Sequence, residues 1–91
     1  MFKKIKKPAY VLYRLVENDI IILNAKSNLY YSLDKIGAMI WQLLMQGKTI
    51  DEIVDLIKNK YALSKRDKVR QDVGEIFGNF VKEGLVELCK D

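Results

Sequence analysis

The chain has no histidine, and among its 91 residues it has one cysteine and one proline. Without histidine, the Ser-His and Cys-His pairs that activate a nucleophile are excluded. The single thiol, Cys89, has no partner for an internal disulfide and cannot supply a zinc site. No glycine-rich phosphate loop follows any expected strand. We therefore expect a protein that is not an enzyme by itself and that holds neither a metal nor another cofactor.

Long apolar runs are also missing. None approaches the roughly 20 residues that a membrane-spanning helix needs. The charged start of the chain is not followed by a long apolar stretch, so a secretory signal is not expected. An unpaired cysteine suits a reducing compartment. These features predict a cytoplasmic protein without a membrane partner.

The positive charge of the chain is concentrated at its start. The net charge is +4, and Lys3, Lys4, Lys6 and Lys7 account for it, because basic and acidic residues balance from Pro8 onward. We expect residues 1–8 to form a basic N-terminal tail and residues 9–91 to form one domain, with the ordered region beginning near Pro8. Such a tail is either simply solvated or attracts an acidic peptide or RNA.

The first half of the chain predicts three strands. Residues 10–16 are rich in β-branched and aromatic side chains, and residues 20–23 and 29–33 form two further short apolar runs. Polar turns separate the runs, so the strands should form an antiparallel meander. Because residues 20–23 are all apolar, we expect the second strand to be central and covered on both faces. The third strand is then an edge.

The apolar spacing becomes that of helices after Leu33. The first expected helix ends at Gly47, and its apolar face repeats every three or four residues, at Ile36, Met39, Ile40, Leu43 and Leu44. Thr49 and Glu52 have the spacing of a capping box, which predicts the start of a second helix.

Ser64 and Asp67 have the same spacing as Thr49 and Glu52 and predict the start of a third helix. This helix is expected to end at Gly84. An extended segment, Leu85–Leu88, should pack back on the core. The fold class is therefore α+β, a three-stranded antiparallel sheet followed by three helices.

The third strand is the feature that best predicts binding. Exposed strand edges are normally protected by charge or proline, and Leu29-Tyr30-Tyr31-Ser32-Leu33 has neither. Such an edge can bind an extended peptide as an added strand. Alternatively, a helix or the basic tail covers the edge, or the aromatic residues belong to the core.

The third helix contains two glycines four residues apart, Gly74 and Gly78. Each should cost roughly 1 kcal/mol relative to alanine, which suggests a close approach of another backbone. We expect this helix to form the second wall of a peptide groove. Tight packing against another helix is the alternative. The candidate peptide-binding residues are Leu29, Tyr30, Tyr31, Ser32, Leu33, Arg70, Val73, Gly74, Phe77 and Gly78.

The order of these segments resembles the PqqD-like family, also called RiPP recognition elements. The resemblance rests on residues 22–28, residues 29–33, the helix openings at residues 34–41 and 47–53, and Asp72-Val73 and Gly84-Leu85-Val86. It implies a winged helix-turn-helix-like fold that binds the leader segment of a ribosomally made precursor peptide. In that family the leader pairs as an extra strand beside the third strand, in a groove completed by the third helix.

The resemblance also implies a second partner, either a separate modifying enzyme or a leader peptidase. Within the family, we favour the lasso-peptide type over the quinone cofactor pathway. The Tyr30-Tyr31 strand and the Gly37-Ala38…Trp41 helix start resemble both types.

Two other functions stay open. A winged-helix DNA-binding protein would need a basic recognition helix, whereas the second helix begins with Asp51, Glu52 and Asp55, so no nucleic-acid partner is expected. An open edge strand could also pair with its own copy. We expect a monomer or a weak dimer.

Overall fold

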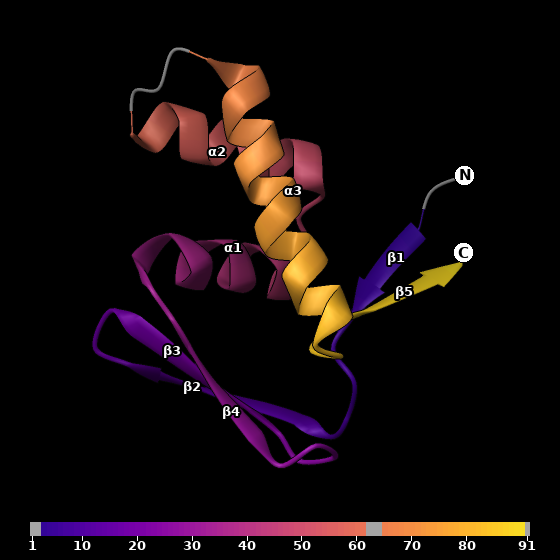
Figure 1. Ribbon diagram of the computed structural model, residues 1–91. Coiled ribbons are helices and arrows are strands. Elements are labelled where there is room, and N and C mark those ends of the chain that lie inside the picture. Colours follow the sequence, from indigo (N-terminus) through magenta and orange to yellow (C-terminus); the bar gives the residue numbers. More distant parts are fainter. Residues whose placement is uncertain (1–2, 62–64, 91) are drawn as a thin grey trace.

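The computed structural model describes residues 3–61 and 65–90. Within these residues the chain forms five strands and three helices (Figure 1). In chain order they are β1 (Lys3–Lys6), β2 (Val11–Val16), β3 (Asp19–Asn24), β4 (Leu29–Leu33), α1 (Lys35–Met45), α2 (Ile50–Lys60), α3 (Arg66–Lys82) and β5 (Glu87–Lys90). The predicted class, an antiparallel meander followed by three helices, is confirmed.

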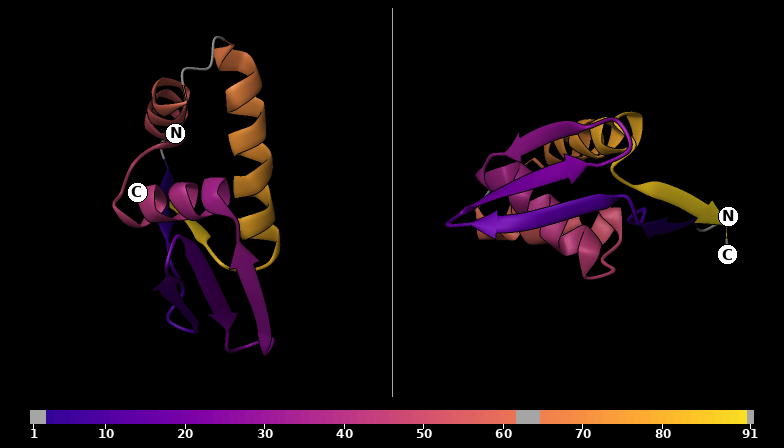
Figure 2. Two further views of the ribbon diagram at one scale, coloured as in Figure 1. Left: turned by 90° about the vertical axis from the view of Figure 1, so that its left-hand side faces the viewer. Right: turned by 90° about the horizontal axis from the view of Figure 1, so that it is seen from below.

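The meander is a three-stranded antiparallel sheet with the order β2-β3-β4. Its register pairs Tyr13 with Ile22 and Ile22 with Tyr31. The expectation that the second predicted strand is central and the third an edge is therefore confirmed. The helices lie together on one side of the sheet, and α3 descends from the far end of α2 toward the end of β3 and the start of β4 (Figure 1, Figure 2).

The two faces of the sheet differ. Ile20 and Ile22 are fully buried beneath the helices, whereas Ile21 is 39% exposed on the opposite face. The expectation that the second strand is covered on both faces is wrong, because successive side chains of a strand alternate between faces. No described element packs on the outer face, and Leu12 and Tyr30 are 55% and 72% exposed there.

Local chemistry accounts for the starts of α1 and α2 and for the end of α3. The Asp34 side chain accepts a hydrogen bond from the Gly37 N–H at the start of α1, and the Thr49–Glu52 capping box opens α2. The residue before α3 is Lys65, which makes no side-chain cap, and the predicted start at Ser64 lies outside the described residues. Gly84 follows α3 with a φ of +73°, a conformation that disfavours other residues.

The core lies between the sheet and the helices. Trp41 of α1 is fully buried at its centre and makes edge-on contacts with Phe80 of α3 at 5.3 Å and with Tyr13 of β2 at 5.5 Å between ring centroids. These contacts join the sheet, α1 and α3 through one side chain. They hold α3 at a fixed distance from the sheet.

The N-terminal segment is more than a tail. Residues 3–6 form β1, which pairs antiparallel with β5, and Ile5 lies opposite Leu88. The expectation that order begins at Pro8 is therefore corrected. Its physical reason is that the predicted C-terminal extended segment supplies a pairing partner, which local composition cannot reveal. The two strands form a separate ribbon that projects from the body and brings the two ends together (Figure 1).

Candidate peptide-binding groove

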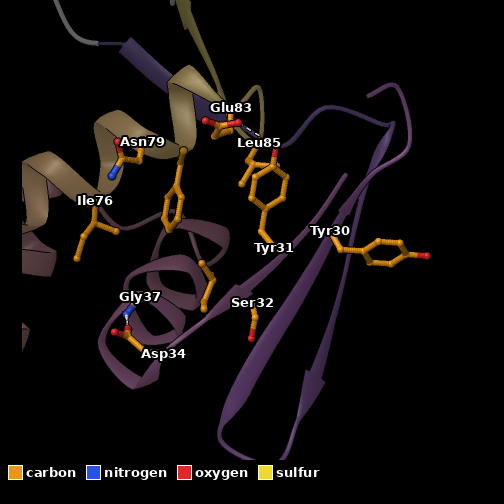
Figure 3. Close-up of a pocket in the computed structure, with 11 residues that line it drawn as sticks. Tyr30, Tyr31, Ser32, Asp34, Gly37, Ile76, Asn79, Glu83 and Leu85 are labelled. Atoms are coloured by element: carbon orange, nitrogen blue, oxygen red, sulfur yellow. Dashed lines mark hydrogen bonds between the residues drawn. The ribbon is translucent and has the colours of Figure 1, made fainter. Parts of the chain in front are cut away.

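A cavity separates the edge strand from the last helix. It measures about 500 Å³ and lies between β4, the first turn of α1 and the C-terminal half of α3 (Figure 3). Its lining residues come from these elements and from the segment after α3: Tyr30, Tyr31, Ser32, Leu33, Asp34, Gly37, Ile76, Asn79, Phe80, Glu83 and Leu85. β4 pairs only with β3 among the described strands, so its other edge is open beside this cavity.

Four of the five predicted strand residues line this cavity. Tyr31 and Leu33 are half-buried, whereas Tyr30 and Ser32 are exposed. Figure 3 shows the Tyr31 side chain pointing toward α3 and the Tyr30 ring pointing away from the cavity. Leu29, at the start of the strand, is 51% exposed and does not line it. An edge strand with an open side and an adjacent cavity can accept an extended peptide as an added strand.

A hydrogen bond connects the two walls. The Tyr31 hydroxyl donates to Glu83 Oε1 at 2.9 Å, from the middle of β4 to the residue that follows α3. Loss of contact with water, together with the hydrogen bond and the negative charge of Glu83, raises the pKa of Tyr31 above its ordinary value of 10.0. The phenol therefore stays protonated and keeps donating across the physiological pH range.

Asn24 fixes the end of α3 against the sheet. This buried residue ends β3, and its amide nitrogen donates to the Glu83 carbonyl at 3.1 Å. Its amide oxygen accepts from the Lys26 and Ser27 N–H groups at 3.0 and 3.2 Å, which shapes the turn into β4. One side chain thus positions both walls of the groove.

The helical wall differs from the predicted one. Ile76, Asn79, Phe80 and Glu83 face the cavity, and their spacing of three or four residues places them on one side of α3. The predicted residues lie elsewhere on the helix. Val73 is buried in the core, and Phe77 is half-buried against it. Neither lines the cavity beside β4.

The other three predicted residues of α3 also lie outside this cavity. Arg70 donates a hydrogen bond to the carboxylate of Asp51 and forms an ion pair with it, which joins α3 to α2. A Cβ atom added to Gly74 or Gly78 would meet no heavy atom within 4 Å. Close packing inside the chain therefore does not explain the two glycines. Contact of these five α3 residues with a peptide stays a prediction.

The sequence contained a signal for the face of α3 that lines the cavity. Ile76 and Phe80 belong to the apolar face of the third helix, and Glu83 continues it one turn later. Asp34 and Gly37 follow the edge strand directly, so they had to lie at its end. Gly74 and Gly78 instead indicated the neighbouring face of α3, because the free-energy cost of two glycines in a helix suggested a contact with a ligand.

A second, smaller cavity of about 310 Å³ lies between the three helices, and Ile76 lines both cavities. No group of three or more potential metal ligands occurs in the part of the chain that the structure describes. Across residues 3–61 and 65–90, no helix is both long and apolar enough to cross a membrane.

Comparison with known proteins identifies relatives of this architecture. Residues 19–86 match the family model described as coenzyme PQQ synthesis protein D (PqqD). No curated protein sequence matches the chain. Among solved structures, TbiB1 in complex with the TbiA(β) leader peptide superposes with a TM-score of 0.86 at 29% identity, covering 94% of this chain and 99% of that one.

A second solved structure has the same fold. Lasso peptide synthetase B1 complexed with the leader peptide superposes with a TM-score of 0.84 at 15% identity, covering 92% of this chain and 98% of that one. Both comparisons span nearly the whole of each protein. Since the family model covers most of the chain, from β3 to the segment before β5, this protein belongs to the PqqD-like family.

Proposed function

We propose that this protein binds the leader segment of a ribosomally made precursor peptide by β-strand addition to β4. The observation that carries the proposal is the open edge of β4 beside the cavity formed with α1 and α3. The two similar structures are complexes with leader peptides, and one of them is described as a lasso peptide synthetase B1. We therefore favour a lasso-peptide leader over one from the quinone cofactor pathway.

The free energy gained by such a strand pairing is sufficient to offset the cost of ordering a flexible leader. Four or five strand hydrogen bonds contribute ~1 kcal/mol each, and one or two buried side chains add ~1.5–3 kcal/mol each. Ordering a flexible leader opposes this gain. The balance corresponds to a dissociation constant between roughly micromolar and nanomolar. Backbone pairing supplies affinity for any extended chain, so discrimination between peptides comes from side chains that enter the cavity.

The bound leader is then presented to a separate modifying enzyme or leader peptidase, and the protein itself performs no catalysis. The absence of histidine from the chain and of a metal-ligand cluster from its described residues supports this division of roles. The test is to measure processing of the precursor by its pathway enzyme with and without this protein. Equal rates would refute the presentation step while leaving peptide binding intact.

Binding is tested by titrating ¹⁵N-labelled protein with the TbiA(β) leader peptide and with leaders from other precursor families. We expect saturable shifts in the amide signals of β4 and of residues 76–83. Shifts confined to other elements, or none with any leader, would refute the proposal. A scrambled leader of the same composition is the matched control.

Strand addition has a more specific signature. Only alternate residues of an added strand donate hydrogen bonds to the edge that they join. Single N-methylation along the bound peptide should therefore weaken binding at every second position and leave the intervening positions unchanged. A uniform effect would indicate another mode of binding. This test leaves the protein unaltered, so misfolding cannot imitate the result.

Salt and concentration distinguish the alternatives. Binding to DNA would weaken steeply as salt rises, because each phosphate contact releases counterions. Strand addition depends on salt much less. If sedimentation instead shows a dimer that the leader does not dissociate, the open edge pairs with a second copy and the peptide role fails.

A further inference from the structure

The groove is acidic within a basic protein. Two carboxylates, from Asp34 and Glu83, line the cavity beside β4, and no lysine or arginine is among its described lining residues. The chain as a whole carries a net charge of +4. In Figure 3 the two carboxylates lie at opposite ends of the cavity, with apolar and amide side chains between them.

Both carboxylates keep hydrogen-bond acceptor sites for which the structure records no donor among the described residues. Glu83 Oε1 accepts one hydrogen bond, from the Tyr31 hydroxyl at 2.9 Å, and Asp34 Oδ1 accepts one from the Gly37 N–H at 2.9 Å. An ionised carboxylate has about four acceptor sites. Among the described side chains, neither Asp34 nor Glu83 has a cation within 4.0 Å.

Three other acidic residues of the helices are neutralised by ion pairs among the described residues, whereas Glu52, Asp67 and Glu75 form none but do not line the cavity. Asp51 and Asp55 form ion pairs with arginines of α3, and Asp72 pairs with Lys68 at 3.2 Å. The contrast separates the two carboxylates of the groove from the three that an ion pair neutralises. Asp34 and Glu83 both line the cavity in which a peptide side chain would lie, and each keeps further acceptor sites.

Between the carboxylates the cavity wall is apolar. Leu33, Phe80 and Leu85 contribute to it, and Phe80 and Leu85 are buried beneath. A lysine or arginine side chain suits such a surface, because its methylene stem lies along apolar atoms while its charged end reaches an acceptor. Hydrogen bonds between such a cation and a carboxylate are about twice as strong as neutral ones.

We propose that the groove selects a leader that carries a lysine or arginine side chain, which enters the cavity and binds the Glu83 carboxylate, with Asp34 favouring the same charge at the other end. This inference rests on the proposed function, because it specifies the peptide that the same groove accepts. Glu83 is then a specificity-determining residue. The Tyr31 hydroxyl orients its carboxylate by holding one oxygen.

The test uses a library of random peptides of about 12 residues, displayed on phage and selected on the immobilised protein. Selection is repeated on the Asp34→Asn/Glu83→Gln variant. Asparagine still caps a helix and glutamine still accepts from Tyr31, so the fold and the shape of the groove are preserved. The control variant, Asp19→Asn/Glu75→Gln, makes the same change of charge at exposed positions that do not line the cavity.

We expect peptides selected on the wild type and on the control to carry lysine or arginine at one fixed position, and this enrichment to disappear on the groove variant. For one selected peptide, Glu83→Gln should weaken binding about tenfold. Replacing the basic residue by glutamine should cost the same factor on the wild type and little on the variant. Glu83→Lys should prefer the peptide with glutamate at that position.

The outcomes separate this inference from the proposed function. Peptides selected without basic enrichment, or with enrichment that the groove variant retains, would overturn the charge preference and leave peptide binding established. Selection of no peptide at all, together with silence toward the leader panel, would overturn both. A loss of enrichment on the control variant as well would show that net charge alone is responsible and would also overturn it.

Discussion

The side-chain amide of Asn24 donates a 3.1 Å hydrogen bond to the backbone carbonyl of Glu83, which joins the end of β3 to the end of α3. Asn24 is 4% exposed and is the only buried polar side chain in the described chain. Its oxygen also accepts two backbone N–H groups of the turn before β4. Both walls of the groove are therefore set by one residue.

Asn24→Ala should lower the free energy of unfolding by about 2–4 kcal/mol, because it removes three hydrogen bonds that are worth roughly 1 kcal/mol each. The leader affinity should fall as well, since the distance between β4 and α3 is no longer fixed. Urea denaturation measures the first effect and peptide titration the second. Asn59→Ala, at an exposed position of α2, is the matched control and should change neither. Equal stability of the two variants would contradict the role of Asn24.

The Tyr31–Glu83 hydrogen bond predicts a change of stability at high pH. Because the fold raises the pKa of Tyr31, its contribution is complete below the ordinary value of 10.0 and is lost as the pH rises through the raised value. Urea midpoints measured from about pH 8 to pH 11 should therefore fall less steeply for Tyr31→Phe than for the wild type. Tyr30→Phe, whose ring is exposed on the same strand, should match the wild type. Identical slopes for all three proteins would contradict the prediction.

The local sequence pattern was sufficient to predict individual elements of the fold, including the strand that forms one wall of the groove. The charge-free, proline-free run at residues 29–33 is an edge strand, and the capping box at Thr49 and Glu52 opens α2. Both features depend on residues near each other in the sequence. The pairing of β1 with β5 depends instead on two ends that are more than 80 residues apart, as the register of Lys3 with Lys90 shows.

The position of the cavity along α3 could not be predicted for a related reason. Val73 and Phe80 are both buried apolar residues of α3, but only Phe80 reaches the cavity. Which part of an apolar face meets the sheet depends on the crossing of α3 over α1, and that crossing is fixed by Trp41 and Asn24. No spacing rule within one helix contains this information.

The ion pair of Asp51 in α2 with Arg70 in α3 is predicted to stabilise the fold in a way that is lost in acid. The hydrogen bond and charge of Arg70, with a further contribution from Arg66, lower the pKa of Asp51 below its ordinary value of 3.8. The contribution is therefore present above that value and is lost as the pH falls through the lowered one. Asp51→Asn should show a flatter decline of stability between about pH 4 and pH 2 than the wild type. The effect should be small, because the pair is exposed and solvent screens it.

The matched control is Asp19→Asn, an exposed carboxylate at the start of β3 that makes no ion pair with a described residue. Its acid decline should follow the wild type, and added salt should narrow the difference between wild type and Asp51→Asn. A flatter decline in both variants would show that any lost carboxylate has this effect, so the ion pair would not be its source.

The glycines of α3 give a prediction that separates stability from binding. An added Cβ at Gly74 or Gly78 meets no atom within 4 Å, and neither glycine has a positive φ. Gly74→Ala and Gly78→Ala should therefore each raise the free energy of unfolding by roughly 1 kcal/mol, since alanine loses less backbone entropy in a helix. Gly84→Ala should lower the free energy of unfolding, because Gly84 has a φ of +73°. A Cβ atom added there would also lie 3.5 Å from the amide nitrogen of Asn24.

Combining the two alanine substitutions in one variant tests which face of α3 meets the peptide. Neither glycine lines the cavity beside β4, so Gly74→Ala/Gly78→Ala should bind the leader with wild-type affinity while unfolding at higher urea. The reference is Asn79→Ala, on the face that lines the cavity, which should weaken binding. If the glycine variant instead folds more stably but loses affinity, a peptide backbone approaches α3 at Gly74 and Gly78. The groove would then extend along the helix beyond Ile76, and the cost of two glycines in a helix would be explained by the ligand.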